Sequence, residues 1–211
     1  FEHLHFELPN ARVCRLATEE NDSPRCMPDF NGPPTVFILA RIDSAQMYKG
    51  HCELIEAWPQ VVSCVPAARL VIAGDGSGLA RVSDMASRSP VSSSIDVLGF
   101  VSAERLEHIW STAHVFAMPS KGEGFGLVYI EAMRHGLPVI ASVHDAGQEV
   151  NIDGETGYNV DLNDPEELAA RIVRLLSDRD QARAMGASGR ERWQSQFRYS
   201  AFTTRLMDIL E

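Results

Sequence analysis

The stretch PSKGEGFGLVYIEAM, from Pro119 to Met133, decides how this chain folds. It follows an apolar run of strand length, Val115 to Met118, whose composition is typical of a buried strand. The helix that it opens is expected to end where Gly136 and Pro138 follow. A strand, a glycine-rich turn and a helix in this order direct unsatisfied backbone N–H groups at an anion. The stretch therefore predicts an anion-binding loop.

Three glycines and two acids give this loop its chemistry. Gly122, Gly124 and Gly126 allow the main chain to approach a ligand closely, and at Gly124 and Gly126 we expect a Cβ to collide. Glu123 lies in the turn, whereas Glu131 lies two turns into the helix. The two carboxylates can therefore address different parts of one elongated ligand. A diphosphate flanked by two hydroxyl-bearing rings suits that layout.

The string Pro-Ser-x-x-Glu-Gly-Phe-Gly-Leu-Val-x-x-Glu-Ala-Met resembles the paired-glutamate motif of retaining nucleotide-sugar glycosyltransferases, and most closely that of family 4 of the GT-B fold. The plainer alternative is a strand–turn–helix unit with two solvated glutamates, which does not explain three glycines around an acid. The resemblance extends from Thr35 to the C-terminus. It implies the C-terminal, donor-binding half of a two-domain enzyme whose N-terminal domain binds the acceptor.

The resemblance also implies roles for the motif residues. Glu123 would hydrogen-bond the hydroxyls of the transferred sugar and stabilise the oxocarbenium-like transition state, without acting as a covalent nucleophile. Glu131 would bind the ribose hydroxyls. The sugar and the phosphates would be held by the backbone amides of the loop and the helix start, namely Gly124, Phe125, Gly126, Leu127 and Val128.

A second pattern follows the first expected strand, Thr35–Ala40. The residues Ala40-Arg41-Ile42 and Tyr48-Lys49-Gly50 resemble the Gly-Arg-x and Lys-Gly signature of the family, whose Arg and Lys hold the donor diphosphate. Ala40 replaces the usual glycine, which puts the tightness of that turn in doubt. Two cations would stabilise the charge that the leaving diphosphate gains, without a metal. Lys121 is a weaker candidate, because the motif leaves its position variable.

Two further glycine turns are expected near the donor. Gly74-Asp75-Gly76-Ser77-Gly78 is predicted to be a tight turn and not a dinucleotide fingerprint, because Leu79 stands where a third glycine is required. In similar proteins the main chain at Phe100 and Val101 lies against the nucleobase, while the Phe100 ring is equally consistent with a core position. Only Glu104 offers a carboxylate to guanine N–H donors, so uracil is slightly favoured.

Two acidic stretches remain open to interpretation. Asp145 to Glu149 resembles a family loop, and Glu149 is equally consistent with facing the sugar or with capping local N–H groups. Asp178-Arg179-Asp180 has a metal-binding appearance, but it lies at an expected helix junction, so we interpret its acids as solvated and predict no metal site. His135, at a helix C-terminus, is expected to interact favourably with the helix dipole.

The rest of the chain alternates short apolar strands with helices. This alternation predicts the α/β class: a Rossmann-like, doubly wound parallel sheet with C-terminal helices. We expect residues 1–34 to be an interdomain segment or linker, with a possible short strand at 11–16, and residues 35–211 to form the nucleotide-sugar-binding domain. Expected helices are 50–65, 79–89, 103–112, 167–176, 181–196 and 199–210, and expected strands are 69–73, 95–98, 139–142 and 158–160, with Asp164 as an N-cap before Pro165.

Composition excludes several classes of function. A formal net charge of −10 argues against nucleic acid as a partner, and the 211 residues contain no apolar run of membrane-spanning length. The four cysteines have no zinc spacing, so reduced thiols in the cytoplasm are expected. The missing acceptor domain would leave room for peripheral attachment at the inner membrane face. Because the chain begins at Phe1, we expect a fragment.

These observations together predict a retaining glycosyltransferase that uses a UDP-sugar or a GDP-sugar and needs no cofactor. The acceptor, whether a glycan, a lipid-linked sugar or a small molecule, lies beyond the sequence, and the fragment alone is expected to be inactive. Two alternatives stay open. One is another GT-B enzyme, such as a nucleotide-sugar epimerase or a phosphorylase. The other is a non-catalytic module that binds nucleotide sugars.

Overall fold

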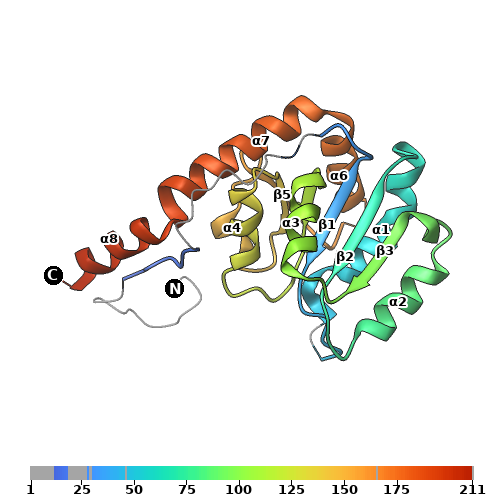
Figure 1. Ribbon diagram of the computed structural model, residues 1–211, viewed down its shortest axis with the longest axis horizontal. Coiled ribbons are helices and arrows are strands. Elements are labelled where there is room, and N and C mark those ends of the chain that lie inside the picture. Colours follow the sequence, from blue (N-terminus) through green and yellow to red (C-terminus); the bar gives the residue numbers. More distant parts are fainter. Residues whose placement is uncertain (1–11, 19–27, 29, 46, 165, 211) are drawn as a thin grey trace.

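A computed structural model of the chain describes residues 12–18, 28, 30–45, 47–164 and 166–210, which form a parallel sheet with helices on both faces (Figure 1). The sheet has six strands in the order β3-β2-β1-β4-β5-β6. The predicted fold class is confirmed. The strands are β1 (Thr35–Leu39), β2 (Arg69–Ala73), β3 (Ile95–Gly99), β4 (Val115–Ala117), β5 (Val139–Ser142) and β6 (Gly157–Val160).

The order of the strands determines which helices cover which face. The chain moves from β1 to β3 in one direction across the sheet and from β4 to β6 in the other, so right-handed crossovers place the connecting helices on opposite faces. In chain order the helices are α1 (His51–Cys64), α2 (Leu79–Arg88), α3 (Ala103–Thr112), α4 (Leu127–Arg134), α5 (Gly147–Val150), α6 (Glu167–Ser177), α7 (Arg179–Arg192) and α8 (Tyr199–Leu210). α1 packs against α2 and α6, and α4 packs against α7.

The reversal of direction lies between β1 and β4, which pair with Val36 opposite Val115 and Phe37 opposite Phe116. All four side chains are fully buried. Aromatic packing continues around them, because the Trp110 ring of α3 lies 4.8 Å from that of Phe37 in an edge-on arrangement. In open parallel sheets the loops that follow such a pair of strands border a ligand crevice.

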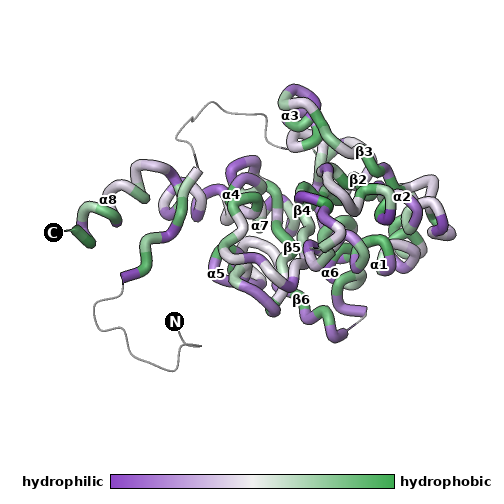
Figure 2. The backbone as a smooth tube through the Cα atoms, turned by 90° about the horizontal axis from the view of Figure 1, so that it is seen from below, coloured by the Kyte–Doolittle hydropathy of each residue, from purple (hydrophilic) through white to green (hydrophobic). Residues whose placement is uncertain are grey.

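The C-terminal helices and the N-terminal segment lie together (Figures 1 and 2). α7 continues through a π-helical turn, Trp193–Phe197, into α8, which extends away from the sheet. Residues 12–18 lie beside these helices: Trp193 Nε1 donates to Thr18 Oγ1 at 2.8 Å, and an Arg205 nitrogen donates to the carbonyl of Arg15 at 3.0 Å. The suggested strand at 11–16 is wrong for its described residues, because these contacts leave Thr18 as an isolated bridge and form no ladder.

The cap of α6 and the start of α7 differ from the sequence prediction. α6 begins at Glu167, as expected, but its N-cap is Glu166 and not Asp164, whose carboxylate accepts the Glu166 N–H at 3.0 Å in the turn before the helix; Pro165 lies outside the described residues. α7 begins two residues earlier than expected, since Asp178 accepts the N–H of Gln181 at 2.9 Å and caps it. Asp178 is therefore a capping residue, and both Asp178 and Asp180 are exposed, as predicted.

His51, the first residue of α1, is a buried polar group of unusual character. Its side chain is fully buried, and neither ring nitrogen has a hydrogen-bond partner among the described residues. Burial, assisted by the positive charge of Lys49, lowers the pKa of His51 from 6.5 to about 4. The imidazole is therefore neutral in the folded protein at neutral pH.

The His51→Met variant should reduce the pH dependence of stability between pH 6.5 and about 5. In the unfolded chain the imidazole takes up a proton near pH 6.5 that the folded protein does not accept until about pH 4, so the wild type loses stability as the pH falls. Chemical denaturation of both proteins across this range measures the difference. His108→Met, at an exposed position of α3, is the control and should keep the wild-type slope. An unchanged slope in His51→Met would contradict this account.

Candidate functional site

The glycine-rich loop between β4 and α4 is fixed by its own glycines and by Tyr129. Gly126 has a φ of +87° and acts as the N-cap of α4, and a Cβ on it would overlap the Tyr129 ring. The Tyr129 hydroxyl is buried and donates to the carbonyl of Met118 at 2.6 Å. Burial and the nearby carboxylates of Asp145 and Glu123 raise the pKa of Tyr129 well above its usual value, so it stays protonated as the donor.

Asp145 joins this loop to the neighbouring one, between β5 and α5. One of its carboxylate oxygens accepts the Glu123 N–H and the other accepts the Gly147 N–H, both at 2.8 Å. The carbonyl of Glu123 in turn accepts the N–H of Ala146 at 3.2 Å. This role of Asp145 could not be predicted from the sequence, because its partner lies 22 residues away along the chain. Its position three residues after the end of the fifth strand was the available signal.

The side chain of Glu123 pairs with one of the two predicted cations and shares a cavity with the other. Lys49 Nζ lies 2.6 Å from Glu123 Oε2, and the two side chains are only 16% and 19% exposed. Because both groups are largely buried, salt screens this pair less than it screens a surface ion pair. Arg41 is exposed and lines the same cavity. Two cations and one acid therefore meet next to the N-terminus of α4.

These residues line a cavity of about 430 Å³ at the carboxyl ends of β1 and β4. The structure thus brings together most of the residues that the sequence assigned to the sugar and the phosphates. The lining consists of Leu16, Leu39, Ala40, Arg41, Lys49, Met118, Glu123, Phe125, Gly126, Leu127 and Val128. Gly124 is not part of the lining, and a Cβ on it would meet nothing within 4 Å, so the expected collision there does not occur with any described residue. An anion at the start of α4 would meet free N–H groups and two cations.

Glu131 lines a second cavity of about 390 Å³, whose walls include Trp110, Arg134 and His135. His135 is the C-cap of α4 and stacks on Trp110, with ring centroids 5.1 Å apart. The two glutamates of the motif therefore line different cavities. The binding of ribose by Glu131 stays a prediction.

Gly74 and Gly76 support the loop that carries Arg41. Both have positive φ values, of 141° and 145°, and a Cβ on either would overlap the carbonyl of Ala40 or Ile42. Asp43 stiffens the same loop: the N–H of Ala45 and the hydroxyl of Ser77 lower its pKa. The turn is therefore as tight as predicted, and its glycines serve backbone packing.

At the end of β3, the Phe100 side chain is 78% exposed, which excludes the core position considered for it, and Val101 is partly buried. Lys121 lies 3.5 Å from Glu53 on α1 and does not line the cavity of Glu123. Glu149 is exposed on α5, and Asp145, not Glu149, caps that loop.

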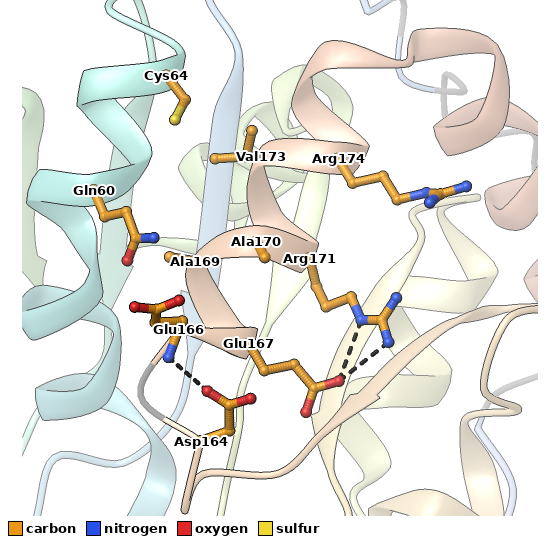
Figure 3. A pocket seen from close by; sticks show the side chains of 10 residues that line it. All are labelled: Gln60, Cys64, Asp164, Glu166, Glu167, Ala169, Ala170, Arg171, Val173 and Arg174. Atoms are coloured by element: carbon orange, nitrogen blue, oxygen red, sulfur yellow. Dashed lines mark hydrogen bonds and ion pairs between the residues drawn. The ribbon is translucent and has the colours of Figure 1, made fainter.

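A larger cavity of about 750 Å³ lies between α1 and α6 (Figure 3). Two of its acids have local partners, since Glu167 pairs with Arg171 at 3.1 Å and Asp164 accepts the N–H of Glu166. None of its lining residues comes from the glycine-rich loop or from a strand end at the reversal. Among the described residues, no group of three His, Cys, Asp or Glu side chains gathers as metal ligands would.

Comparison with known proteins identifies the family. The sequence model of the group described as "Glycosyl transferases group 1" matches residues 27–192, most of the chain and both motifs. This chain belongs to that family. It is 35% identical over 184 residues to a GDP-mannose-dependent alpha-(1-6)-phosphatidylinositol monomannoside mannosyltransferase of Mycobacterium tuberculosis, covering 84% of this chain and 47% of that protein. It is 30% identical over 218 residues to the GDP-mannose-dependent monoacylated alpha-(1-6)-phosphatidylinositol monomannoside mannosyltransferase of Corynebacterium glutamicum, covering 100% of this chain and 56% of that protein.

Solved structures agree with the family assignment. Sucrose-phosphate synthase from Thermosynechococcus elongatus superposes with a TM-score of 0.80 at 29% identity, over 94% of this chain and 51% of that one. The Anabaena protein HepE, in complex with UDP and glucose, shares the fold with a TM-score of 0.74 at 20% identity, over 86% and 49%. This chain spans about half the length of the curated relatives it matches. None of the helices in the described ranges combines the length and apolar character that crossing a bilayer requires.

Substitution of Gly126 and of Gly124 should show which of these two glycines the fold itself requires. Gly126→Ala should cost about 1–3 kcal/mol of folding free energy, because φ is +87° and the new Cβ meets Tyr129. Gly124→Ala should change stability by less than about 0.5 kcal/mol, because its Cβ points into open space. Denaturant unfolding of both variants tests this. Equal losses would show that the fold itself requires both glycines.

Proposed function

We propose that this chain is the donor-binding half of a retaining glycosyltransferase that transfers mannose from GDP-mannose. The observation that carries the proposal is the convergence of Arg41, Lys49 and Glu123 with the N-terminus of α4 in one cavity. Membership of the family supports the class of reaction. The relatives named above as GDP-mannose-dependent support the donor. The slight preference for uracil rests only on the few carboxylates near Phe100, and we give the relatives more weight.

The proposed chemistry uses charge and position. As the bond between the sugar and the diphosphate breaks, the leaving phosphate gains negative charge, which Arg41, Lys49 and the N–H groups of α4 stabilise. Glu123 stabilises the positive charge that develops at the anomeric carbon. A leaving phosphate oxygen accepts the proton of the acceptor hydroxyl as that hydroxyl bonds to the same face of the sugar. The anomeric configuration is thereby retained without a covalent intermediate.

The nucleoside would extend from this cavity toward the one that contains Glu131. The Glu131 carboxylate would accept hydrogen bonds from the ribose hydroxyls, which are charge-assisted and therefore strong. The base would lie against the main chain of Phe100 and Val101, and the exposed Phe100 ring offers a stacking surface. Gly74 and Gly76 would act indirectly, by fixing the loop of Arg41.

The acceptor site would lie mainly on a second domain, as the double length of the relatives suggests. α8 extends from the body (Figure 2) and exposes the apolar side chains of Tyr199, Met207 and Leu210, which are suited to contact with such a domain. Because the relatives are named for acceptors that contain phosphatidylinositol, we propose an inositol-bearing acceptor. The enzyme would then work at the cytoplasmic membrane face, attached through the second domain.

Transfer itself distinguishes this function from its alternatives. The chain combined with an acceptor-binding domain from a relative should move labelled mannose to an inositol-bearing lipid, whereas the chain alone should bind the donor without turnover. Formation of an epimer without any acceptor would instead indicate a nucleotide-sugar epimerase. Donor binding without transfer to any acceptor would indicate a binding module.

Calorimetric titration of the chain should show that GDP-mannose binds equally well with and without excess chelator, because Arg41, Lys49 and α4 supply the positive charge. UDP-glucose should bind more weakly than GDP-mannose. A large loss of affinity with chelator would refute the metal-independent site.

The Glu131→Gln variant should cost about 1–2 kcal/mol of binding free energy for GDP in the same titration, as expected when a charged acceptor becomes neutral. Glu149→Gln, which changes an exposed acid on α5, is the control and should bind GDP as the wild type does.

A further inference from the structure

The Lys49–Glu123 ion pair joins two fixed backbones through two side chains that face a cavity. Two hydrogen bonds hold the main chain of Glu123. Its N–H donates to the Asp145 carboxylate at 2.8 Å, and its carbonyl accepts the N–H of Ala146 at 3.2 Å. Lys49 ends the short helical turn Met47–Lys49, and its ammonium group lies 5.3 Å from the centre of the Tyr48 ring. Only the side chains therefore need to move for the 2.6 Å contact to break.

A bound diphosphate would compete for this cation. Phosphate oxygens at the N-terminus of α4 need Lys49, while the largely buried Glu123 carboxylate already holds it. A free nucleoside diphosphate must either share Lys49 with Glu123 or leave that carboxylate beside the phosphates without its partner, and both choices cost binding free energy. A sugar on the diphosphate changes this balance, because its hydroxyls donate hydrogen bonds to Glu123.

We propose that the Lys49–Glu123 ion pair is a specificity element that makes the site prefer the sugar-bearing donor over the free nucleoside diphosphate. The inference rests on the proposed function of the cavity. Donor binding exchanges one ion pair for two new interactions, Lys49 with phosphate and Glu123 with the sugar. Once the sugar has been transferred, Glu123 loses its hydroxyl partners and takes Lys49 back. The product then keeps Arg41 but loses a cation, and its release is favoured.

The test is calorimetric titration of the chain with GDP and with GDP-mannose, in the wild type and in Glu123→Gln, Lys49→Gln and the double variant. Glu123→Gln should bind GDP about three- to tenfold more tightly than the wild type, because Lys49 is freed. It should bind GDP-mannose more weakly, so the dissociation constant for GDP divided by that for GDP-mannose falls by more than about tenfold. Lys49→Gln alone should also lower this ratio, and it leaves the glycine-rich loop unchanged.

The double variant distinguishes two ways in which Glu123 could weaken GDP binding: by holding Lys49 in the ion pair, or by simple repulsion between its carboxylate and the phosphates. In the Lys49→Gln background, Glu123→Gln should tighten GDP binding much less, because no cation is released. Equal tightening in both backgrounds would mean repulsion alone and would overturn the proposal. Glu131→Gln, in the neighbouring cavity, should weaken both ligands by the same factor. A wild type that binds neither ligand would refute the proposed function itself, whereas binding of both with an unchanged ratio in Glu123→Gln would refute only this inference.

Discussion

The site depends on the parallel pairing of β1 with β4. These strands begin the two halves of the sheet, so the chain leaves them in opposite directions while their carboxyl ends stay adjacent. The loop after β1 carries Arg41 and Lys49, and the loop after β4 carries Glu123. A backbone hydrogen bond from the Lys121 N–H to the carbonyl of Tyr48, at 2.9 Å, joins the two loops once the strands are paired. The buried, register-defining contacts of Phe37 and Phe116 bring the cations and the acid together, because they fix the two strands against one another.

The rest of the site consists of groups held in place before a ligand arrives. Asp145 fixes the main chain of Glu123, Tyr129 fixes the start of the loop at Met118, and Gly126 allows the turn into α4. Preorganised charges and dipoles stabilise a developing charge at little reorganisation cost, which is the main demand of a reaction with a charged leaving group. In a chain with a net charge of −10, these local groups and not the overall field must attract an anionic donor.

The sequence predicted what is encoded locally. Buried parallel strands and amphipathic helices carry their pattern in consecutive residues, so the bounds of α3, β5 and α8 were predicted correctly. Contacts between distant segments carry no such pattern. The role of Asp145 was missed because it depends on Glu123 across the fold, and the strand suggested at 11–16 was wrong because the N-terminal segment packs on the π-helical turn Trp193–Phe197 and on α8. The exposure of the Phe100 ring likewise depends on what covers β3, which no local pattern reveals.

Amide hydrogen exchange of the chain with and without GDP-mannose tests the central claim most directly, namely that the crevice between β1 and β4 is the donor site. Protection should increase in two separate segments, 40–50 and 122–131, which meet only in the folded sheet. Residues 164–174, which line the larger cavity between α1 and α6, should exchange as they do without ligand. Protection confined to 164–174, with none at 122–131, would contradict the account.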